Sequence, residues 1–198
     1  MTVIELSYND LQIVIANDPR HAVDSKDNSI NYDNIYKDKE HDDYVYLPKH
    51  SIGIYRNEKK IKQALVTSNG GATGVHNTCS IICNDTLLIC CGNSIFCLTL
   101  PDLELCWQTK ADSATCFEIY KYENDFIIHG ELEISKLDIS GKIIWSFSGN
   151  DIFTTPTGRN EFKIVEDVIY ATNWDNYIFE IDARTGCVLN DNLKRSKT

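Results

Sequence analysis

The chain has 198 residues, a formal net charge of −10 at pH 7 and a sequence pI of about 4.9, with 42% hydrophobic residues. This composition indicates a soluble globular domain with enough apolar material for a core. The acidic balance argues against a nucleic-acid binder, because phosphate binding needs a basic footprint. It favours a basic protein as partner, although solubility alone would also account for it.

The start of the chain does not look like an export signal. Residues 1–8 have no basic start and too short an apolar run, and no stretch reaches the roughly 18 apolar residues of a membrane span. We therefore expect a cytoplasmic protein without a membrane partner.

The first part of the chain, residues 1–78, predicts irregular β-structure around a long polar loop at 18–43. Asn9-Asp10 separates two apolar runs, as in a hairpin. A Gly-rich stretch at 68–74 lacks the Lys-Ser/Thr ending of a phosphate loop and is interpreted as a tight connection. The expected strands are 3–6, 11–15, 44–47, 52–55 and 61–66.

Residues 79–192 contain one pattern three times. Each unit has an Asn/Glu-Asp turn, two apolar runs and a large apolar or aromatic residue near its end: 84–107, 124–145 and 166–189. Asp85, Asp125 and Asp167 follow one another at spacings of 40 and 42 positions. Four short β-rich runs per unit at this period are typical of propeller blades.

The predicted fold is therefore all-β, a small or incomplete β-propeller-like arrangement of four-stranded antiparallel meanders. We expect a single domain over 1–198. In the second unit the expected strands are 115–121, 126–129, 133–138 and 142–148. Because Trp107 and Trp145 occupy equivalent places, we predict that they pack between blades.

Eight cysteines are present, without a CxxC pair. Most fall in predicted strands, where a reduced cysteine acts as a small hydrophobe. Cys90 and Cys91 are adjacent and could form a vicinal disulfide. On a strand, however, they would point to opposite faces, one thiol inward and one outward.

No motif predicts catalysis, a cofactor or a metal site. The five histidines have no metal-ligand spacing, and no P-loop, dinucleotide fingerprint or nucleophile elbow occurs. His129 precedes a tight turn with two glutamates, where a structural or surface histidine is favoured over acid-base chemistry. We predict that the protein is not an enzyme.

Trp174 lies in the turn Asn173-Trp174-Asp175-Asn176 between two predicted strands. A tryptophan beside an acid can anchor an interface, or it could fold back over a neighbouring blade. Together with acids in other predicted turns it gives the candidate partner-binding set: Asp42, Asp43, Asp112, Glu131, Glu133, Asp151, Trp174 and Asp175.

Two resemblances are carried by short strings. The unit endings L-D-I-S-G-K-I-I-W (137–145) and I-D-A-R-T-G-C-V-L (181–189) look like the repeat endings of quinoprotein alcohol dehydrogenases. The string G-K-I-I-W-S-F-S-G-N-D-I-F (141–153), in a short acidic chain of propeller-like repeats, resembles small bacterial immunity proteins of polymorphic toxin systems, including contact-dependent growth inhibition.

The second resemblance implies a toxin inhibitor that covers the active site of a basic nuclease toxin, its carboxylates taking the places of phosphates. A general propeller-type scaffold or ligand-binding module is the alternative, and an enzyme is a third. One-to-one binding of a basic partner would favour the inhibitor. Association with many chains would favour the scaffold, and turnover that depends on His129 or Cys90 would favour the enzyme.

Overall fold

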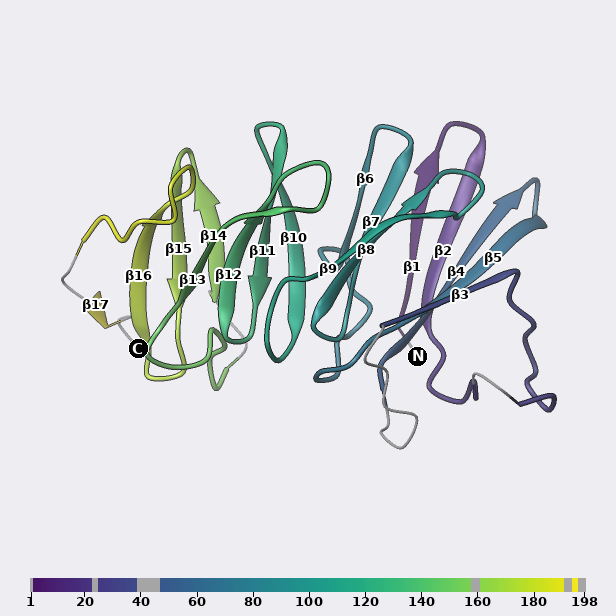
Figure 1. Cartoon of the computed structure of the whole chain (residues 1–198), viewed down its shortest axis with the longest axis horizontal. Coiled ribbons are helices and arrows are strands. Elements are labelled where there is room, and N and C mark those ends of the chain that lie inside the picture. The colour runs from purple at the N-terminus through teal and green to yellow at the C-terminus, as the bar shows by residue number, and fades with distance from the viewer. Residues whose placement is uncertain (1, 23–24, 39–46, 158–160, 191–193, 196–198) are drawn as a thin grey trace.

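Four β-sheets follow one another in a row, in chain order, with the first and last sheets at opposite ends (Figure 1). The computed structural model describes residues 2–22, 25–38, 47–157, 161–190 and 194–195. Residues 194 and 195 are described by their backbone alone. The first sheet contains β1 (Val3–Tyr8), β2 (Leu11–Asn17), β4 (Lys49–Arg56), β5 (Lys59–Thr67) and β3 (Asn34–Lys37) in spatial order. The second contains β6 (Ser80–Cys83), β7 (Thr86–Cys91), β8 (Ser94–Thr99) and β9 (Leu105–Lys110). The third contains β10 (Cys116–Tyr122), β11 (Asp125–Gly130), β12 (Glu133–Leu137) and β13 (Ile143–Ser148), and the fourth β14 (Phe162–Val165), β15 (Val168–Thr172), β16 (Tyr177–Asp182) and β17 (Lys194–Arg195).

The last three sheets are four-stranded antiparallel meanders, which confirms the predicted all-β, propeller-like class. The four strands expected in the second repeat match β10 to β13 to within one or two residues at their ends. The part of the chain that the structure describes contains no helix that could cross a bilayer.

Two-residue turns join the first and second strands of every sheet, and the first residue of each turn has positive φ: Asn9, Asn84, Glu123 and Glu166. Asp85 and Asp167 occupy the second turn position, which Asn124 fills in the third sheet. Asp125 is already the first residue of β11. The repeat spacing based on Asp125 was therefore one residue out of phase.

The predicted polar loop at 18–43 is not loop throughout, because it contributes β3, which pairs in parallel with β5. Ile35 and Tyr36 are the apolar residues of this strand. The polar composition of the segment as a whole concealed them. The Tyr36 hydroxyl donates to the carbonyl oxygen of Leu103 at 2.8 Å and so joins the first sheet to the second. Of the strand expected at 44–47, residues 44–46 lie outside the described part of the chain.

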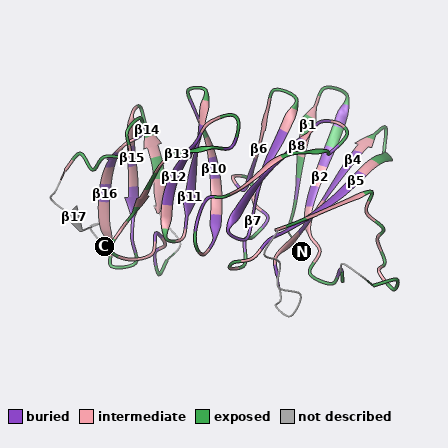
Figure 2. Ribbon diagram, in the orientation of Figure 1, coloured by how far each residue is buried: buried purple, intermediate pink, exposed green. Residues whose placement is uncertain are grey.

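The core is densest in the second sheet, because the sheets on either side cover both of its faces (Figure 2). Every residue from Leu87 to Leu98 is buried. Cys90 and Cys91 are both fully buried, so the expected outward thiol does not face solvent. Burial raises the pKa of the Cys91 thiol to about 12, and it also raises the pKa of the Cys90 thiol well above its ordinary value.

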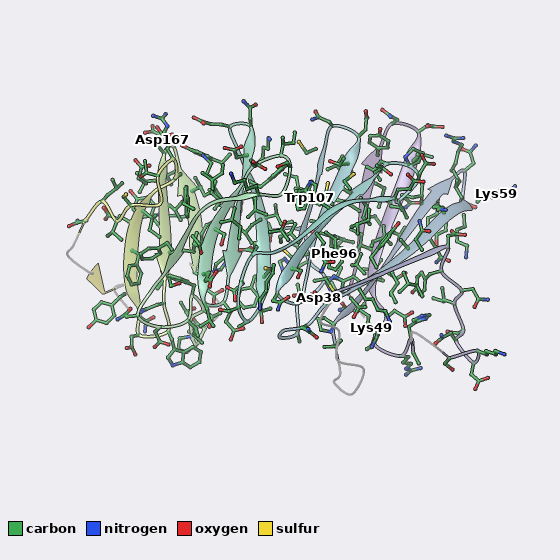
Figure 3. All side chains as sticks on the ribbon, viewed as in Figure 1. Asp38, Lys49, Lys59, Phe96, Trp107 and Asp167 are labelled. Atoms are coloured by element: carbon green, nitrogen blue, oxygen red, sulfur yellow. The ribbon has the colours of Figure 1, made fainter. Side chains whose placement is uncertain are left out.

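Trp107 and Trp145 pack against the following sheet, as predicted from their equivalent positions. Trp107 is labelled in Figure 3. A Cβ added to Gly141 would lie 2.5 Å from the Trp107 ring, and one added to Gly186 would lie 2.7 Å from the Trp145 ring. Both glycines have positive φ, at 83° and 73°. Close approach and backbone conformation thus both require glycine in these turns.

Candidate functional site

One end of the strands gathers the connections between sheets and the turns between second and third strands, along the lower edge of Figure 1. We call this surface the connection end and define it by residues 68–79, 92–93, 111–115, 131–132, 149–157 and 173–176. All the predicted partner-binding residues within the described chain belong to these loops or directly flank them.

Backbone hydrogen bonds cross from sheet to sheet along the connection end. The amide of Asn93 donates to Asn69 at 2.8 Å, and that of Glu131 donates to Thr115 at 2.7 Å. Further along, the Phe153 amide donates to the Glu131 carbonyl at 2.7 Å. These bonds tie each loop to its neighbour, so the surface presents side chains from a fixed backbone.

Asp112 is 2% exposed, and its carboxylate is used inside the protein. One oxygen accepts from the amides of Ala114 and Thr115, and the other accepts from those of Leu132 and Glu133 at 2.9 and 2.7 Å. This residue therefore joins two loops and is removed from the predicted partner surface. Its sequence context resembled an ordinary acidic turn, because the distant amides that it binds cannot be read from its neighbours.

Glu131 and Glu133 are half-buried acids near Asp112. Glu131 accepts from the Thr115 hydroxyl at 2.7 Å, and Glu133 accepts from the hydroxyls of Ser113 and Ser146 at 3.4 and 3.2 Å. Both are held in place by neutral donors, so their negative charge is not cancelled by these contacts.

Trp174 is 46% exposed and sits at the head of the β15–β16 turn. Its amide donates to the Ile152 carbonyl at 2.9 Å, which fixes the turn to the preceding connection. Asp151 precedes Ile152, and its carboxylate accepts from the Ile152 amide at 2.8 Å. Asp175 is exposed directly after Trp174. The structure thus brings Asp151, Trp174 and Asp175 to adjoining loops.

The side chain of Asn173 stabilises this turn through hydrogen bonds. It is fully buried, its side-chain oxygen accepts from the Tyr177 amide at 2.8 Å, and its side-chain nitrogen donates to Asn150 at 2.9 Å. Asn176 completes the turn with φ at 62°, a conformation that asparagine tolerates. Trp174 is therefore presented to solvent by a turn whose geometry is fixed.

A hollow of about 290 Å³ opens beside the same connection. It lies over the start of β10, the inner strand of the third sheet. The lining residues are His76, Phe117, Glu118, His129, Thr154 and Glu161. Sequence reasoning singled out His129 but not Glu118, whose partners come from positions 11 and 40 residues away along the chain.

Glu118 and His129 form a buried pair in this hollow. Nδ1 of His129 is 2.8 Å from Glu118, and Nε2 is 2.8 Å from the carbonyl oxygen of Phe153. The Thr78 hydroxyl donates to the other oxygen of Glu118 at 2.6 Å. Burial alone would raise the pKa of Glu118, but the hydrogen bonds from His129 and Thr78 outweigh it and lower the pKa to about 2. His129 itself is buried, so it is not a surface residue.

Asp42 and Asp43 lie outside the described residues. Among the residues that are described, no group of three or more His, Cys, Asp or Glu side chains is arranged to hold a metal ion.

Four sheets in a row, the last three of them antiparallel meanders, define a β-propeller-like fold. The chain is similar to a computationally designed protein, Ika8, with 8% identity over 95% of this chain and 60% of that one, at a TM-score of 0.53. It is similar to BamB from Moraxella catarrhalis, with 17% identity over 71% of this chain and 42% of that one, and to the AfRom2 CNH domain, with 12% identity over 93% and 51%, both at a TM-score of 0.50.

The chain spans less than two thirds of the length of each of these structures. At such low identity the similarity establishes the fold alone. No protein-family model and no curated protein matches the sequence.

Proposed function

We propose that this protein is a non-catalytic binding module of the β-propeller type, whose partner docks on the connection end. The observation that carries the proposal is the exposed Trp174 on a rigid turn. A large aromatic side chain that is already held in place loses little conformational freedom on binding, which is why tryptophan is enriched among interface anchors.

The chemistry around Trp174 favours a basic partner. Asp175 follows it, Asp151 lies on the loop to which its amide is bonded, and Glu131 is on the next loop. The net charge of −10 adds a long-range attraction for a basic protein, which increases the association rate and weakens with salt.

The test is affinity capture with the tagged protein from lysate of its native cell, comparing wild type with Trp174→Ala and Val165→Ala. Val165 is a matched control because it is 48% exposed, on the same sheet but at the other end of its strands. We expect one basic protein, retained at one-to-one ratio by wild type and Val165→Ala and lost with Trp174→Ala. Retention of the same protein by all three would contradict docking at Trp174.

A more specific form of this proposal is an immunity protein that blocks a basic nuclease toxin. The acids beside Trp174 favour it, because carboxylates can occupy the sites where a nuclease holds phosphates. If so, the captured partner cleaves nucleic acid and one equivalent of this protein stops the cleavage. A partner without nuclease activity, or several partners of different kinds, would instead support the general binding module.

A further inference from the structure

The hollow over β10 lies on the other flank of the loop that supports Trp174. Ile152 accepts from the Trp174 amide, Phe153 accepts from His129, and Thr154 lines the hollow. Three consecutive residues thus connect the exposed aromatic turn with the hollow. A molecule on the connection end can reach both.

The hydrogen-bond donors of His129 and Thr78 at the hollow already bind acceptors within the protein. Both ring nitrogens of His129 face acceptors, a carboxylate and a carbonyl oxygen, so neither has a hydrogen left for a ligand. The Thr78 hydroxyl donates to Glu118. Because these donors are satisfied, the hollow offers little to an anion.

Acceptors are in excess. Glu118 receives hydrogen bonds from His129, Thr78 and Tyr120, one fewer than the roughly four that a carboxylate can accept. Glu161 is half-buried, and one of its oxygens accepts from the amide and hydroxyl of Thr155 at 2.7 and 3.2 Å. Two carboxylates therefore line the hollow.

His76 also lines the hollow. Its Nδ1 is 3.1 Å from the Thr78 hydroxyl oxygen. Since that hydroxyl gives its own hydrogen to Glu118, it accepts from His76, and Nδ1 must carry the proton. The neutral ring then has its lone pair on Nε2.

One phenyl ring, that of Phe117, completes the lining. Phe117 lines the hollow and meets the His129 ring edge-on, with centroids 5.6 Å apart, while Phe162 stacks on His129 at 4.6 Å. An aromatic face next to carboxylates is a suitable surface for a cation with an apolar stem.

We propose that this hollow binds an organic cation, a guanidinium or primary ammonium group on a short alkyl chain. The chemistry has two possible sources, a free small cation or an Arg or Lys side chain of the docked partner. The second source rests on the proposed function and deepens it, because a basic partner anchored by Trp174 would place such a side chain beside the same loop.

The first experiment titrates agmatine, which carries both cationic groups, into the whole protein and follows the His129 and Phe117 resonances by NMR. We expect saturable shifts with a Kd of the order of 1 mM, as for a weak small-ligand contact. Inorganic phosphate and neutral pentanamide should give none. Glu161→Gln should weaken agmatine binding at least about fivefold by removing one charge.

The matched control is Glu58→Gln, an exposed acid in the β4–β5 turn at the opposite end, which should leave agmatine binding unchanged. Glu118→Gln is a second variant, used with circular dichroism to show that the fold is kept. Absence of saturable shifts, equal binding of phosphate, or insensitivity to Glu161→Gln would overturn the proposal.

Competition between agmatine and the captured partner shows whether the cation is a free molecule or a side chain of the partner. If agmatine displaces the captured partner and Glu161→Gln weakens that partner, the cation is a partner side chain. If agmatine binds but leaves partner binding unchanged, the hollow takes a free cation. If agmatine fails to bind while Trp174→Ala still abolishes partner binding, the cation site is wrong and the binding module stands.

Discussion

The indole N–H of Trp107 donates to the carbonyl oxygen of Ile139 in the next sheet, at 3.1 Å. Trp145 makes the same bond one sheet further on, to Arg184 at 3.2 Å. In both turns an aspartate accepts from backbone amides and from a Ser or Thr hydroxyl: Asp138 from Ser140, and Asp182 from Thr185. The second and third sheets are thus each bonded to the following sheet through the same motif.

Replacing Trp107 tests this link. Trp107→Ala removes a half-buried ring and should lower the free energy of unfolding by about 2 to 3 kcal/mol. Trp107→Phe keeps most of the apolar contact but loses the bond to Ile139, and should cost about 1 kcal/mol. Urea unfolding measures both. Trp174→Ala is the control and should change stability by less than about 0.5 kcal/mol, because its ring is exposed. Equal losses for Trp107→Ala and Trp174→Ala would contradict the packing role.

Gly141 and Trp107 should be energetically coupled. Gly141→Ala places a Cβ against the Trp107 ring at a positive φ, so we expect a loss of at least about 2 kcal/mol. In a Trp107→Ala background the steric part disappears, and the same change should cost only about 1 kcal/mol. A double-mutant cycle by urea unfolding measures the difference. Strict additivity would show that the two residues do not meet.

Asp112 should matter for stability. Asp112→Asn replaces one carboxylate oxygen by a donor and leaves buried amides of Leu132 and Glu133, or of Ala114 and Thr115, without an acceptor. We expect a loss of about 2 to 3 kcal/mol. Faster hydrogen exchange at the affected amides would localise it. Glu133→Gln, in the same loop but bonded to serine hydroxyls, is the control and should cost less than about 1 kcal/mol. An Asp112→Asn variant with an unchanged free energy of unfolding would refute this role.

Stability should fall in mild acid because of His50. This residue is fully buried, with Nε2 3.2 Å from the Thr73 carbonyl oxygen and no hydrogen-bond partner at Nδ1 among the described residues. Burial lowers its pKa to about 4. The unfolded chain, with the ordinary value near 6.5, then binds the proton more readily. The contribution of neutral His50 to the free energy of unfolding is fully present above about pH 6.5. It is lost as the pH falls towards 4, a change of about 3 kcal/mol.

The measurement is the free energy of unfolding at several pH values for wild type and His50→Leu. The variant cannot titrate at this position, so its profile should be flatter than the wild-type profile between pH 6.5 and 4. Parallel profiles would mean that His50 is already accessible to protons in the folded chain.

The sequence predicted what repeats locally. Alternating apolar runs and Gly or Asn turns placed the strands of the third sheet, and the equivalent positions of Trp107 and Trp145 predicted their packing. It did not predict β3, because Ile35 and Tyr36 are the few apolar residues in a polar stretch and their partner strand β5 follows about 30 residues later. Pairing between distant segments leaves no local signal.

The candidate site was predictable where exposure follows from turn chemistry, as at Trp174 and Asp175. It was not predictable where long-range hydrogen bonds decide the environment. Asp112 looks like any acid in a turn until the amides of Leu132 and Glu133 approach it. Glu118 is one of many acids in an acidic chain, and its significance comes from His129 and Thr78, which belong to other strands and loops.

Docking at Trp174 is tested most directly by calorimetric titration of the purified captured partner into wild type, Trp174→Ala and Val165→Ala at two salt concentrations. We expect one-to-one binding, at least about tenfold weaker for Trp174→Ala, as for an interface anchor, and unchanged for Val165→Ala. We also expect higher salt to weaken the wild-type complex. Equal affinity for Trp174→Ala and Val165→Ala, with no dependence on salt, would contradict docking at Trp174.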